Sequence, residues 1–206
     1  MCTTLPSFCY FCTMHTELLK SIRSKVDLSD EEFQIIRKNV IPRKVRKRQF
    51  ILNAGDVCEY IIFVERGLLR SFADDKDGGE HVMQFATEGW WISDMASFLT
   101  REDSKYNIEA LEESELFLIT KQAMDQIMDS VPLMQRYFLT LMQNHIIALQ
   151  RRINVVQSMS AEETYLALMD VNPDLINRAP QQYIASYLGI TPETLSRVRK
   201  QVSSRK

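Results

Sequence analysis

The sequence contains no apolar run as long as the roughly 18–20 residues that a membrane-spanning helix requires. Its N-terminus also lacks the basic segment followed by an apolar core that marks a secretory signal. We therefore expect a cytoplasmic protein that has no membrane partner. The hydrophobic fraction is 45% and the charged fraction is 25%, which is the balance of a globular chain rather than of a disordered one.

Motifs for catalysis are also missing. The only histidines are His15, His81 and His145, and they stand far apart in the chain. The sequence has no HExxH pair for zinc, no nucleophile elbow and no phosphate-binding loop. These absences predict that the protein is not an enzyme.

Cysteine is scarce, and three of the four residues (Cys2, Cys9 and Cys12) fall within the first twelve positions. That distribution is no disulfide framework for a domain of this size. Together with Cys58, the four thiols are enough for an iron–sulfur cluster or a structural zinc, so a cysteine-based redox or iron–sulfur sensor is an alternative function. If Met14 is the native start, three of them are lost. We predict no metal site and no resident cofactor, because a small buried thiol before a strand is ordinary for Cys58.

The net charge is only −2 at pH 7, so the composition as a whole does not indicate a nucleic-acid partner. The basic residues are unevenly placed, however. Residues 37–48 hold seven Lys or Arg and no acid, and residues 197–206 hold five, again with no acid. Local clusters matter more than the total, because screening limits attraction to phosphate to about 8–10 Å. We interpret the basic run at 43–48 as solvated surface, with DNA contact as the alternative.

Short apolar runs separated by turn residues predict a β-rich region from about residue 43 to 119. Before it, we expect a disordered segment at 1–13, a helix at 16–26, and a second helix that begins with a capping box at Ser29 and ends at Pro42. Several short strands at a spacing of about 8–12 residues are typical of a sandwich or barrel. The expected strands are 50–52, 60–64, 67–72, 81–85 and 115–119.

The pattern becomes helical from Lys121 onward, with a short helix at 121–129 and a long helix after Pro132. Apolar residues in the long helix recur in steps of 3, 4, 3, 4 and 3, which is the seam of a two-stranded coiled coil. Such a narrow stripe favours a dimer contact over the alternative, a helix packed on its own domain. The predicted homodimer seam consists of Leu139, Met142, Ile146, Leu149, Ile153 and Val156.

Two helices joined by a three-residue turn are predicted near the C-terminus, after a helix at 161–171. Pro180 suits the start of the first of the two, and Gly189 supplies the left-handed residue that ends it. Thr191 as N-cap and Pro192 at the first helical position then begin the second. This is helix-turn-helix geometry, for which a packed hairpin with a basic end is the alternative. The residues expected to face inward are Ile184, Ala185, Leu188, Leu195 and Val198.

The second helix of such a motif fits the major groove of DNA and presents its N-terminal residues to the base edges. Glu193 could accept a hydrogen bond from cytosine N4, and Arg197 could donate to guanine. Basic residues farther along the helix are better placed for phosphates, which give affinity without sequence reading. The remaining predicted DNA contacts are Thr191, Thr194, Arg199, Lys200, Arg205 and Lys206.

Three motifs in this order make the chain resemble the Crp/Fnr superfamily of transcription regulators over about residues 20–200. Residues 51–56 and 60–67 are similar to the opening strands of the family, where a Gly-Asp turn precedes an apolar strand that ends in Gly. Residues 85–98 are similar to the segment that enters the family's phosphate-binding cassette. Residues 181–197 are similar to the family's helix-turn-helix, which adds Gln181 to the DNA-contact candidates.

The resemblance implies an α+β fold: an N-terminal β-roll (the double-stranded β-helix of cyclic-nucleotide-binding-like domains), a long dimerisation helix and a C-terminal helix-turn-helix. It also implies a homodimer that reads a palindromic site in double-stranded DNA, with RNA polymerase as a further candidate partner. A signal at the roll would shift the long helices and so change the spacing of the two reading helices. The implied segments are 1–13 disordered, 14–130 sensor, 131–157 dimerisation helix and 158–206 DNA-binding domain.

The chain departs from the family's cyclic-nucleotide binders in the cassette. Those proteins carry Gly-Glu and later Arg-Ser or Arg-Thr, whereas this chain has Ser93-Asp94 and Ser104-Lys105. A phosphate that has no guanidinium partner loses much of its directed binding. We therefore expect no cyclic AMP binding of the usual kind, and either an unknown small-molecule effector or none. The expected pocket comprises Gly89, Ser93, Asp94, Met95, Ser104 and Lys105.

A second departure lies in the reading helix, where Pro192 stands in place of the basic residue that typically precedes Glu193 in the family. The target sequence stays open for this reason, and the sequence does not name the choice between activation and repression. A ligand-binding sensory module that dimerises without reading DNA is the rival function.

Overall fold

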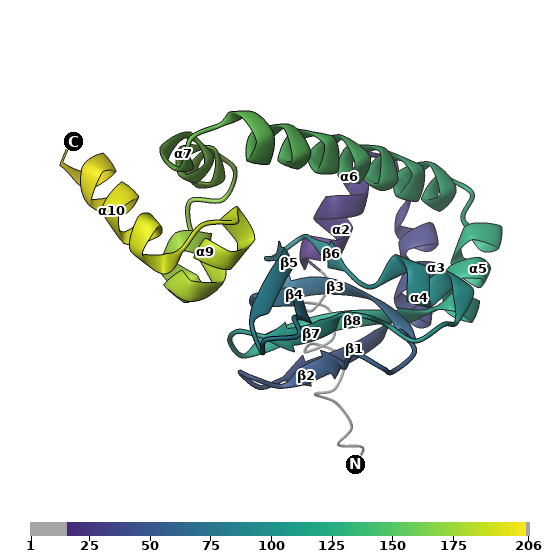
Figure 1. Ribbon diagram of the computed structural model, residues 1–206. Coiled ribbons are helices and arrows are strands. Elements are labelled where there is room, and N and C mark those ends of the chain that lie inside the picture. Colours follow the sequence, from purple (N-terminus) through teal and green to yellow (C-terminus); the bar gives the residue numbers. More distant parts are fainter. Residues whose placement is uncertain (1–15, 205–206) are drawn as a thin grey trace, which may run out of the picture.

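The computed structural model describes residues 16–204, and it describes residue 151 and residues 153–158 by their backbone alone. Figure 1 shows two packed layers of strands beneath one long helix, with a cluster of short helices beyond its far end. The N-terminal segment 1–13, with Cys2, Cys9 and Cys12, lies outside the described residues, and so do Arg205 and Lys206.

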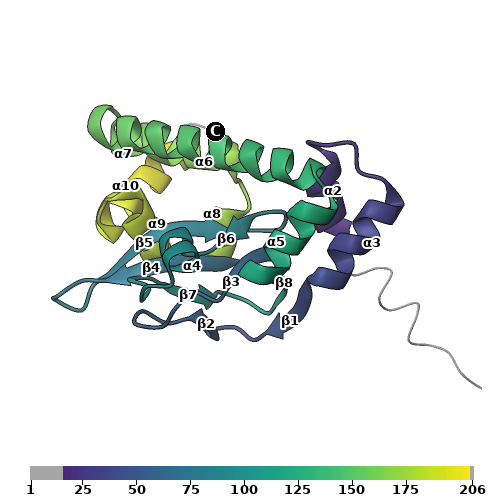
Figure 2. The same cartoon turned by 90° about the vertical axis from the view of Figure 1, so that its right-hand side faces the viewer.

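Two antiparallel sheets face each other and form the β-roll (Figure 2). Their inner faces enclose a core that includes Phe63, Leu69 and Phe117, each almost completely buried. Sheet A is made, in spatial order, of β1 (Ile41–Val45), β8 (Ser114–Thr120), β3 (Tyr60–Arg66) and β6 (Trp91–Ile92). Sheet B is made, in spatial order, of β2 (Phe50–Leu52), β7 (Asn107–Ala110), β4 (Leu69–Asp74) and β5 (Glu80–Ala86).

All five of the expected strands are present, but four elements of the roll are not among the predicted ones. These are the strands β1, β6 and β7 and the helix α4 (Met95–Thr100). The proline at position 42 was also placed wrongly, because the preceding helix ends at Asn39 and Pro42 lies inside β1. A proline is tolerated there because β1 pairs only with β8 and so forms an edge of its sheet.

Three helices cover one end of the roll: α2 (Thr16–Arg23), α3 (Asp30–Asn39) and α5 (Lys121–Ser130). The predicted capping box at Ser29 is confirmed, because its hydroxyl accepts from the Glu32 N–H and the Glu32 carboxylate accepts from the Ser29 N–H. The N-terminus of α2 is tied to β3 by Glu65, whose carboxylate accepts from the N–H groups of Glu17 (2.9 Å) and Leu18 (3.0 Å).

The long helix α6 (Leu133–Ser158) begins after Pro132, as predicted. Met134, Tyr137 and Phe138 bury its first turns against the roll. From Met142 to Gln150 every residue is exposed, so the middle of the helix runs clear of its own domain. Tertiary packing therefore holds α6 at its start, and no part of the chain within the described residues covers the apolar face of its middle.

The C-terminal part, which we call the head, comprises residues 160–204 and follows α6 as a cluster of four helices. Ser160 caps the first of them with a second capping box, closed by Glu163. The segment before Pro180 contains a short helix of its own. In order, the helices are α7 (Ala161–Val171), α8 (Leu175–Arg178), α9 (Gln181–Leu188) and α10 (Pro192–Ser203).

Candidate nucleic-acid interface and effector cavity

The turn between α9 and α10 has the chemistry that the sequence predicts. Gly189 ends α9 with φ of +69°, and the N–H of Ile190 donates to the Ala185 carbonyl at 3.0 Å. Thr191 caps α10 by accepting from the Thr194 N–H, and Pro192 occupies the first helical position. These two ends leave room for only a three-residue connection, which fixes the crossing of the two helices.

A small apolar core holds the two helices together. The residues predicted to face inward are all buried, and Tyr165 of α7 and Ile176 of α8 pack against the same cluster. The buried side chains of the motif are Ile184, Ala185, Leu188, Leu195 and Val198. Because Leu195 and Val198 anchor α10 from one side, the opposite side of the helix faces solvent.

That solvent-facing side carries the predicted reading residues. Glu193, Arg197 and Lys200 are exposed, and Thr194 and Arg199 are half-buried. Arg197 donates to the Thr194 hydroxyl at 3.2 Å, which holds the guanidinium along the helix. Thr191 and Gln181 are also exposed, one at the start of each helix.

The charge on Glu193 is favoured by its place at the start of α10. Its own backbone N–H, the Thr191 hydroxyl and the nearby charge of Arg197 lower the pKa of Glu193 below its usual value. An ionised carboxylate at this position can accept a hydrogen bond but cannot donate one, which suits an amino group on a base edge.

A second candidate site lies between the roll and the first half of α6. It is a cavity of about 480 Å³ with largely apolar walls, within the size range of small-molecule sites. Aromatic side chains from the roll and from α6 supply much of the wall, and among the described residues no carboxylate lines it. The cavity is walled by Trp90, Trp91, Met95, Phe138, Leu141 and Met142, with polar groups from Lys25, Gln84, Ser93, Asn144 and His145.

The structure divides the predicted effector pocket into two parts. Gly89, Ser93 and Met95 line the cavity. Asp94 and Ser104 do not, because the Ser104 hydroxyl donates to the Asp94 carboxylate at 2.8 Å in a buried pair.

The second part of the predicted pocket therefore has a structural task in this chain. Asp94 also caps α4 by accepting from the N–H groups of Ala96 and Ser97, so its carboxylate is already engaged. Lys105 is exposed.

The predicted dimer seam lies on the exposed part of α6. Four members are large apolar side chains open to solvent, with exposed fractions of 59% for Leu139, 38% for Met142, 55% for Ile146 and 45% for Leu149. The side chains of the other two, Ile153 and Val156, lie outside the described residues. Ile147, which the sequence reading did not include, adds to the same exposed surface.

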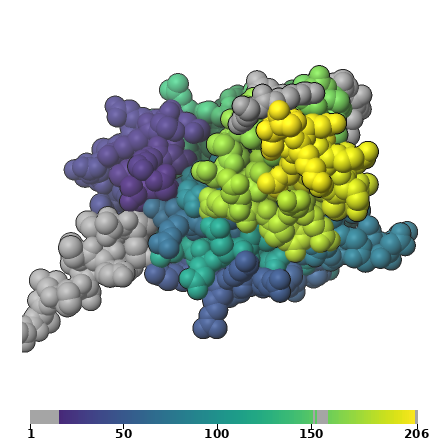
Figure 3. All heavy atoms as spheres, turned by 90° about the vertical axis from the view of Figure 1, so that its left-hand side faces the viewer, coloured from purple at the N-terminus to yellow at the C-terminus, as the bar shows by residue number. Residues whose placement is uncertain are grey.

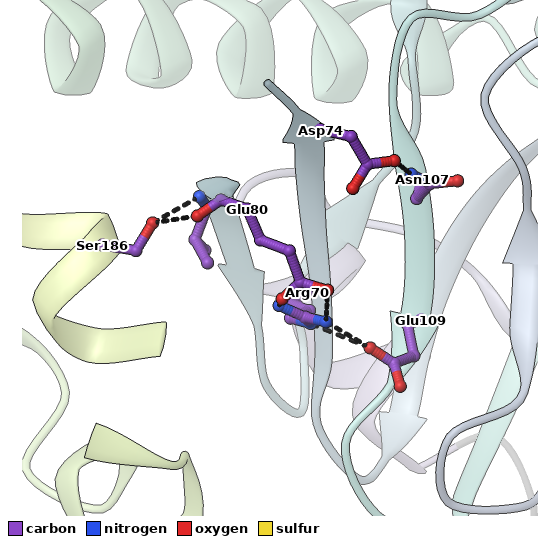
Figure 4. A network of polar contacts seen from close by, with 7 residues as sticks. Arg70, Asp74, Glu80, Asn107, Glu109 and Ser186 are labelled. Atoms are coloured by element: carbon purple, nitrogen blue, oxygen red, sulfur yellow. Dashed lines mark hydrogen bonds and ion pairs between the residues drawn. The ribbon is translucent and has the colours of Figure 1, made fainter. Parts of the chain in front are cut away.

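The sequence reading also missed a buried charge cluster beneath the head. Arg70 of β4 is only 2% exposed, and it pairs with Glu109 of β7 and Glu80 of β5 (Figure 4). The one signal in the sequence is an arginine, with no acid directly beside it, inside the segment Leu68 to Phe72, whose other residues are Leu, Leu, Ser and Phe.

Cys58 is buried, and burial raises the pKa of its thiol. Within residues 16–204, no three His, Cys, Asp or Glu side chains come together as a metal site. None of the helices described in that range is long and apolar enough to cross a membrane.

Comparison with known proteins agrees with this architecture. Residues 42–131 match the family model described as cyclic nucleotide-binding domain. The chain is 28% identical over 205 residues to the regulatory protein HlyX of Actinobacillus pleuropneumoniae, covering 91% of this chain and 83% of that one. It is 26% identical over 182 residues to the fumarate and nitrate reduction regulatory protein of Vibrio cholerae, covering 82% and 70%.

Solved structures show the same fold at lower identity. FixK2 from Bradyrhizobium japonicum superposes with a TM-score of 0.67 at 18% identity, covering 81% of this chain and 85% of that one. The regulator CLP from Xanthomonas campestris gives a TM-score of 0.67 at 15% identity, covering 86% and 93%. The roll, the long helix and the helix-turn-helix define a DNA-binding transcription regulator. Over most of its length the chain is similar to regulators of the Crp/Fnr superfamily, and residues 42–131 form the cyclic nucleotide-binding domain of its roll.

Proposed function

We propose that the protein binds double-stranded DNA as a homodimer and reads a palindromic site with α10. The observation that carries this proposal is the exposed face of α10, where Glu193 and Arg197 lie open to solvent beside Thr194 on a helix whose opposite side is buried in the head. Arg199 and Lys200 lie farther along the helix, where phosphate contacts are expected. The segment boundaries at 14–130, 131–157 and 158–206 belong to the same proposal.

The homodimer in this proposal forms along α6. An isolated helix face that exposes Leu139, Ile146 and Leu149 is costly in water, and pairing with a second copy removes that cost. Pairing two copies along their long helices places two heads at a set separation. A separation of about 34 Å, one turn of the duplex, lets both reading helices enter successive major grooves.

The cavity beside α6 is the proposed effector site, in place of the cassette pocket of the cyclic-nucleotide binders. Its walls are apolar, and the carboxylate and hydroxyl at the cassette positions, Asp94 and Ser104, bind each other. We therefore propose that a small molecule other than cyclic AMP occupies it. Such a ligand acts on the dimer only if it binds one arrangement of the heads more tightly than the other. The proposal further includes a cytoplasmic location, RNA polymerase as a partner and no enzymatic activity.

Selection of bound duplexes from a random DNA pool tests the proposed function. We expect a palindromic sequence, and an affinity whose logarithm falls linearly with the logarithm of salt concentration. Arg197→Ala should weaken binding by about 1–3 kcal/mol and relax the preference at one position of each half-site.

The matched control for Arg197→Ala is Arg101→Ala, which removes the same charge from an exposed ion pair with Glu59 on the roll. We expect this control to bind the selected duplex as the wild type does. Recovery of no sequence above the background of the pool would contradict a reading function and favour a sensory module instead.

A further inference from the structure

The head is packed against the outer face of sheet B as well as being linked to α6. Figure 3 shows the yellow and yellow-green spheres of the head lying directly on the roll. Phe72, Val82 and Phe85 of the roll and Ile176 and Tyr165 of the head share one buried apolar cluster. The orientation of the reading helix is therefore set by contacts with the sensor domain.

Polar contacts fix the register of this packing. β5 is the edge strand of sheet B, and Ser186 of α9 bonds to its free backbone groups (Figure 4). The Ser186 hydroxyl donates to the Glu80 carbonyl at 2.7 Å and accepts from the Val82 N–H at 3.0 Å. One side chain of the head thus satisfies two groups of an open strand edge.

The buried Arg70 adds a stacked contact from the head. Its guanidinium lies between the ring of Phe72, 3.9 Å away, and the ring of Tyr183 in α9, 3.6 Å away. In the plane of the group, Arg70 donates to Glu109 at 2.7 and 2.9 Å and to Glu80 at 2.6 Å. The planar cation, bound along its edge by two carboxylates, therefore presents a flat face on which the ring of Tyr183 stacks.

Arg178, at the end of α8, binds two carboxylates of the roll at once. It donates to both oxygens of Glu88, at 2.8 and 2.9 Å, and also contacts both oxygens of Glu112. Glu88 is held in turn by the Gly67 N–H at 2.8 Å. A guanidinium bound by two carboxylates, each through both oxygens, holds the head against rotation far better than a single ion-pair contact would.

Within a single segment, 80–91, residues that bind the head alternate with residues that line the cavity. Glu88 binds the head, and the next residue, Gly89, lines the cavity. Val82 binds the head, and Gln84 of the same strand lines the cavity. If this segment moves at the cavity wall, the Glu88 carboxylate and the Val82 N–H, which bind the head, move with it.

We propose that Arg178 is a positioning residue for DNA reading: clamped by Glu88 and Glu112, it fixes the head on sheet B, and segment 80–91 carries changes in the cavity to that clamp. The proposal rests on the proposed function, since it concerns how two heads are set for one DNA site. In the docked form Arg178 of α8 and Ser186 of α9 bind the roll, and the reading face of α10 stays exposed.

The test compares duplexes that carry the selected half-sites at the selected spacing and at spacings changed by a few base pairs. We expect Arg178→Ala and Glu88→Gln to bind a single half-site within about twofold of the wild type. Both should lose at least about tenfold of the preference for the selected spacing. A head that moves freely can reach half-sites at several spacings with similar affinity. Arg101→Ala, the control with an equal loss of charge, should keep that preference.

Hydrogen exchange at the Val82 amide reports docking without DNA. It should quicken in Arg178→Ala and Glu88→Gln and stay slow in Arg101→Ala. Spacing preference as sharp as in the wild type, despite fast exchange at Val82, would overturn the positioning role. Unchanged exchange in both clamp variants would overturn the clamp itself. If the wild type selects no DNA, the proposed function fails and the positioning role with it, whereas the exchange result still reports whether Arg178 holds the head.

Discussion

Two glycines with a left-handed backbone show how different the demands on single residues are. At Gly189, which has φ of +69°, an added Cβ would meet nothing within 4 Å. At Gly67, which has φ of +112°, the same atom would lie 2.1 Å from the Ser114 hydroxyl oxygen and 2.8 Å from the Ser114 Cα. The first position demands only the backbone conformation, whereas the second also demands the absence of a side chain.

We expect Gly189→Ala to lower the free energy of unfolding by about 1–2 kcal/mol, the cost of a left-handed residue that has a Cβ. Gly67→Ala should cost clearly more, because a neighbouring backbone must move as well. Denaturant unfolding of the two variants beside the wild type measures the difference. If both variants lose the same free energy of unfolding, the backbone around Ser114 can move to accept the added Cβ at no energetic cost.

At the same scale, the reading residues could be predicted because helical periodicity determines which side chains face away from an anchored side. Leu195 and Val198 are enough to place Glu193 and Arg197 on the free side of α10. The pairing of Asp94 with Ser104 could not be predicted in the same way. It depends on a helix, α4, whose cap consumes the carboxylate.

The N-termini of helices were the most predictable features. Ser29 and Thr191 cap helices as predicted, because a cap depends on residues within one turn of it. The strand β7 was missed because its pattern is not apolar. Asn107 is buried, and it donates to Asp74 and accepts from the Ala54 N–H, partners supplied only by the folded sheet.

The exposed face of α6 leads to a prediction about assembly. Ile146→Lys places a charge in the proposed seam, at a side chain that is 55% exposed in the single chain. The variant should therefore fold normally yet sediment as a monomer at micromolar concentration, because burying an unpaired lysine in a dimer contact is unfavourable. Sedimentation velocity and thermal unfolding together check both halves of this expectation.

Gln143→Lys is the matched control, since Gln143 is an exposed polar residue of the same helix outside the seam. It should remain dimeric. A dimer that survives Ile146→Lys unchanged would show that α6 does not form the interface.

The contact between head and roll belongs to the whole molecule, and no local pattern in the sequence could reveal it. The contacts of Tyr183 with Arg70 and of Arg178 with Glu88 join residues that lie far apart in the sequence. They form only when the head folds back from the end of α6 onto the roll. Arg152, near that end, marks the return: it donates to the carbonyls of Val82 and Tyr187, at 3.3 and 3.2 Å.

The clamp should respond to pH. Burial works to raise the pKa of Glu88, but hydrogen bonds from Arg178 and from the Gly67 N–H lower it below its ordinary value. The folded pKa therefore lies under the unfolded one, near 4.3. The stabilisation is fully present above that value and is lost as the pH falls through the folded pKa.

We accordingly expect the head to undock at acid pH before the roll unfolds. The Val82 amide, followed by hydrogen exchange as the pH is lowered and corrected for intrinsic rates, checks this order. Glu88→Gln should weaken docking at neutral pH and flatten its pH dependence. If the wild type and Glu88→Gln show the same pH dependence of exchange at the Val82 amide, a group other than Glu88 causes the acid sensitivity.

The chain's two tryptophans, Trp90 and Trp91, are neighbours in the cavity wall. Trp90 is 48% exposed, whereas the Trp91 indole N–H donates to the Tyr137 hydroxyl at 3.0 Å. The entire indole emission of the protein thus originates beside a single compartment. Tryptophan fluorescence should therefore change when a ligand enters the cavity, so ligand binding can be followed without an added label.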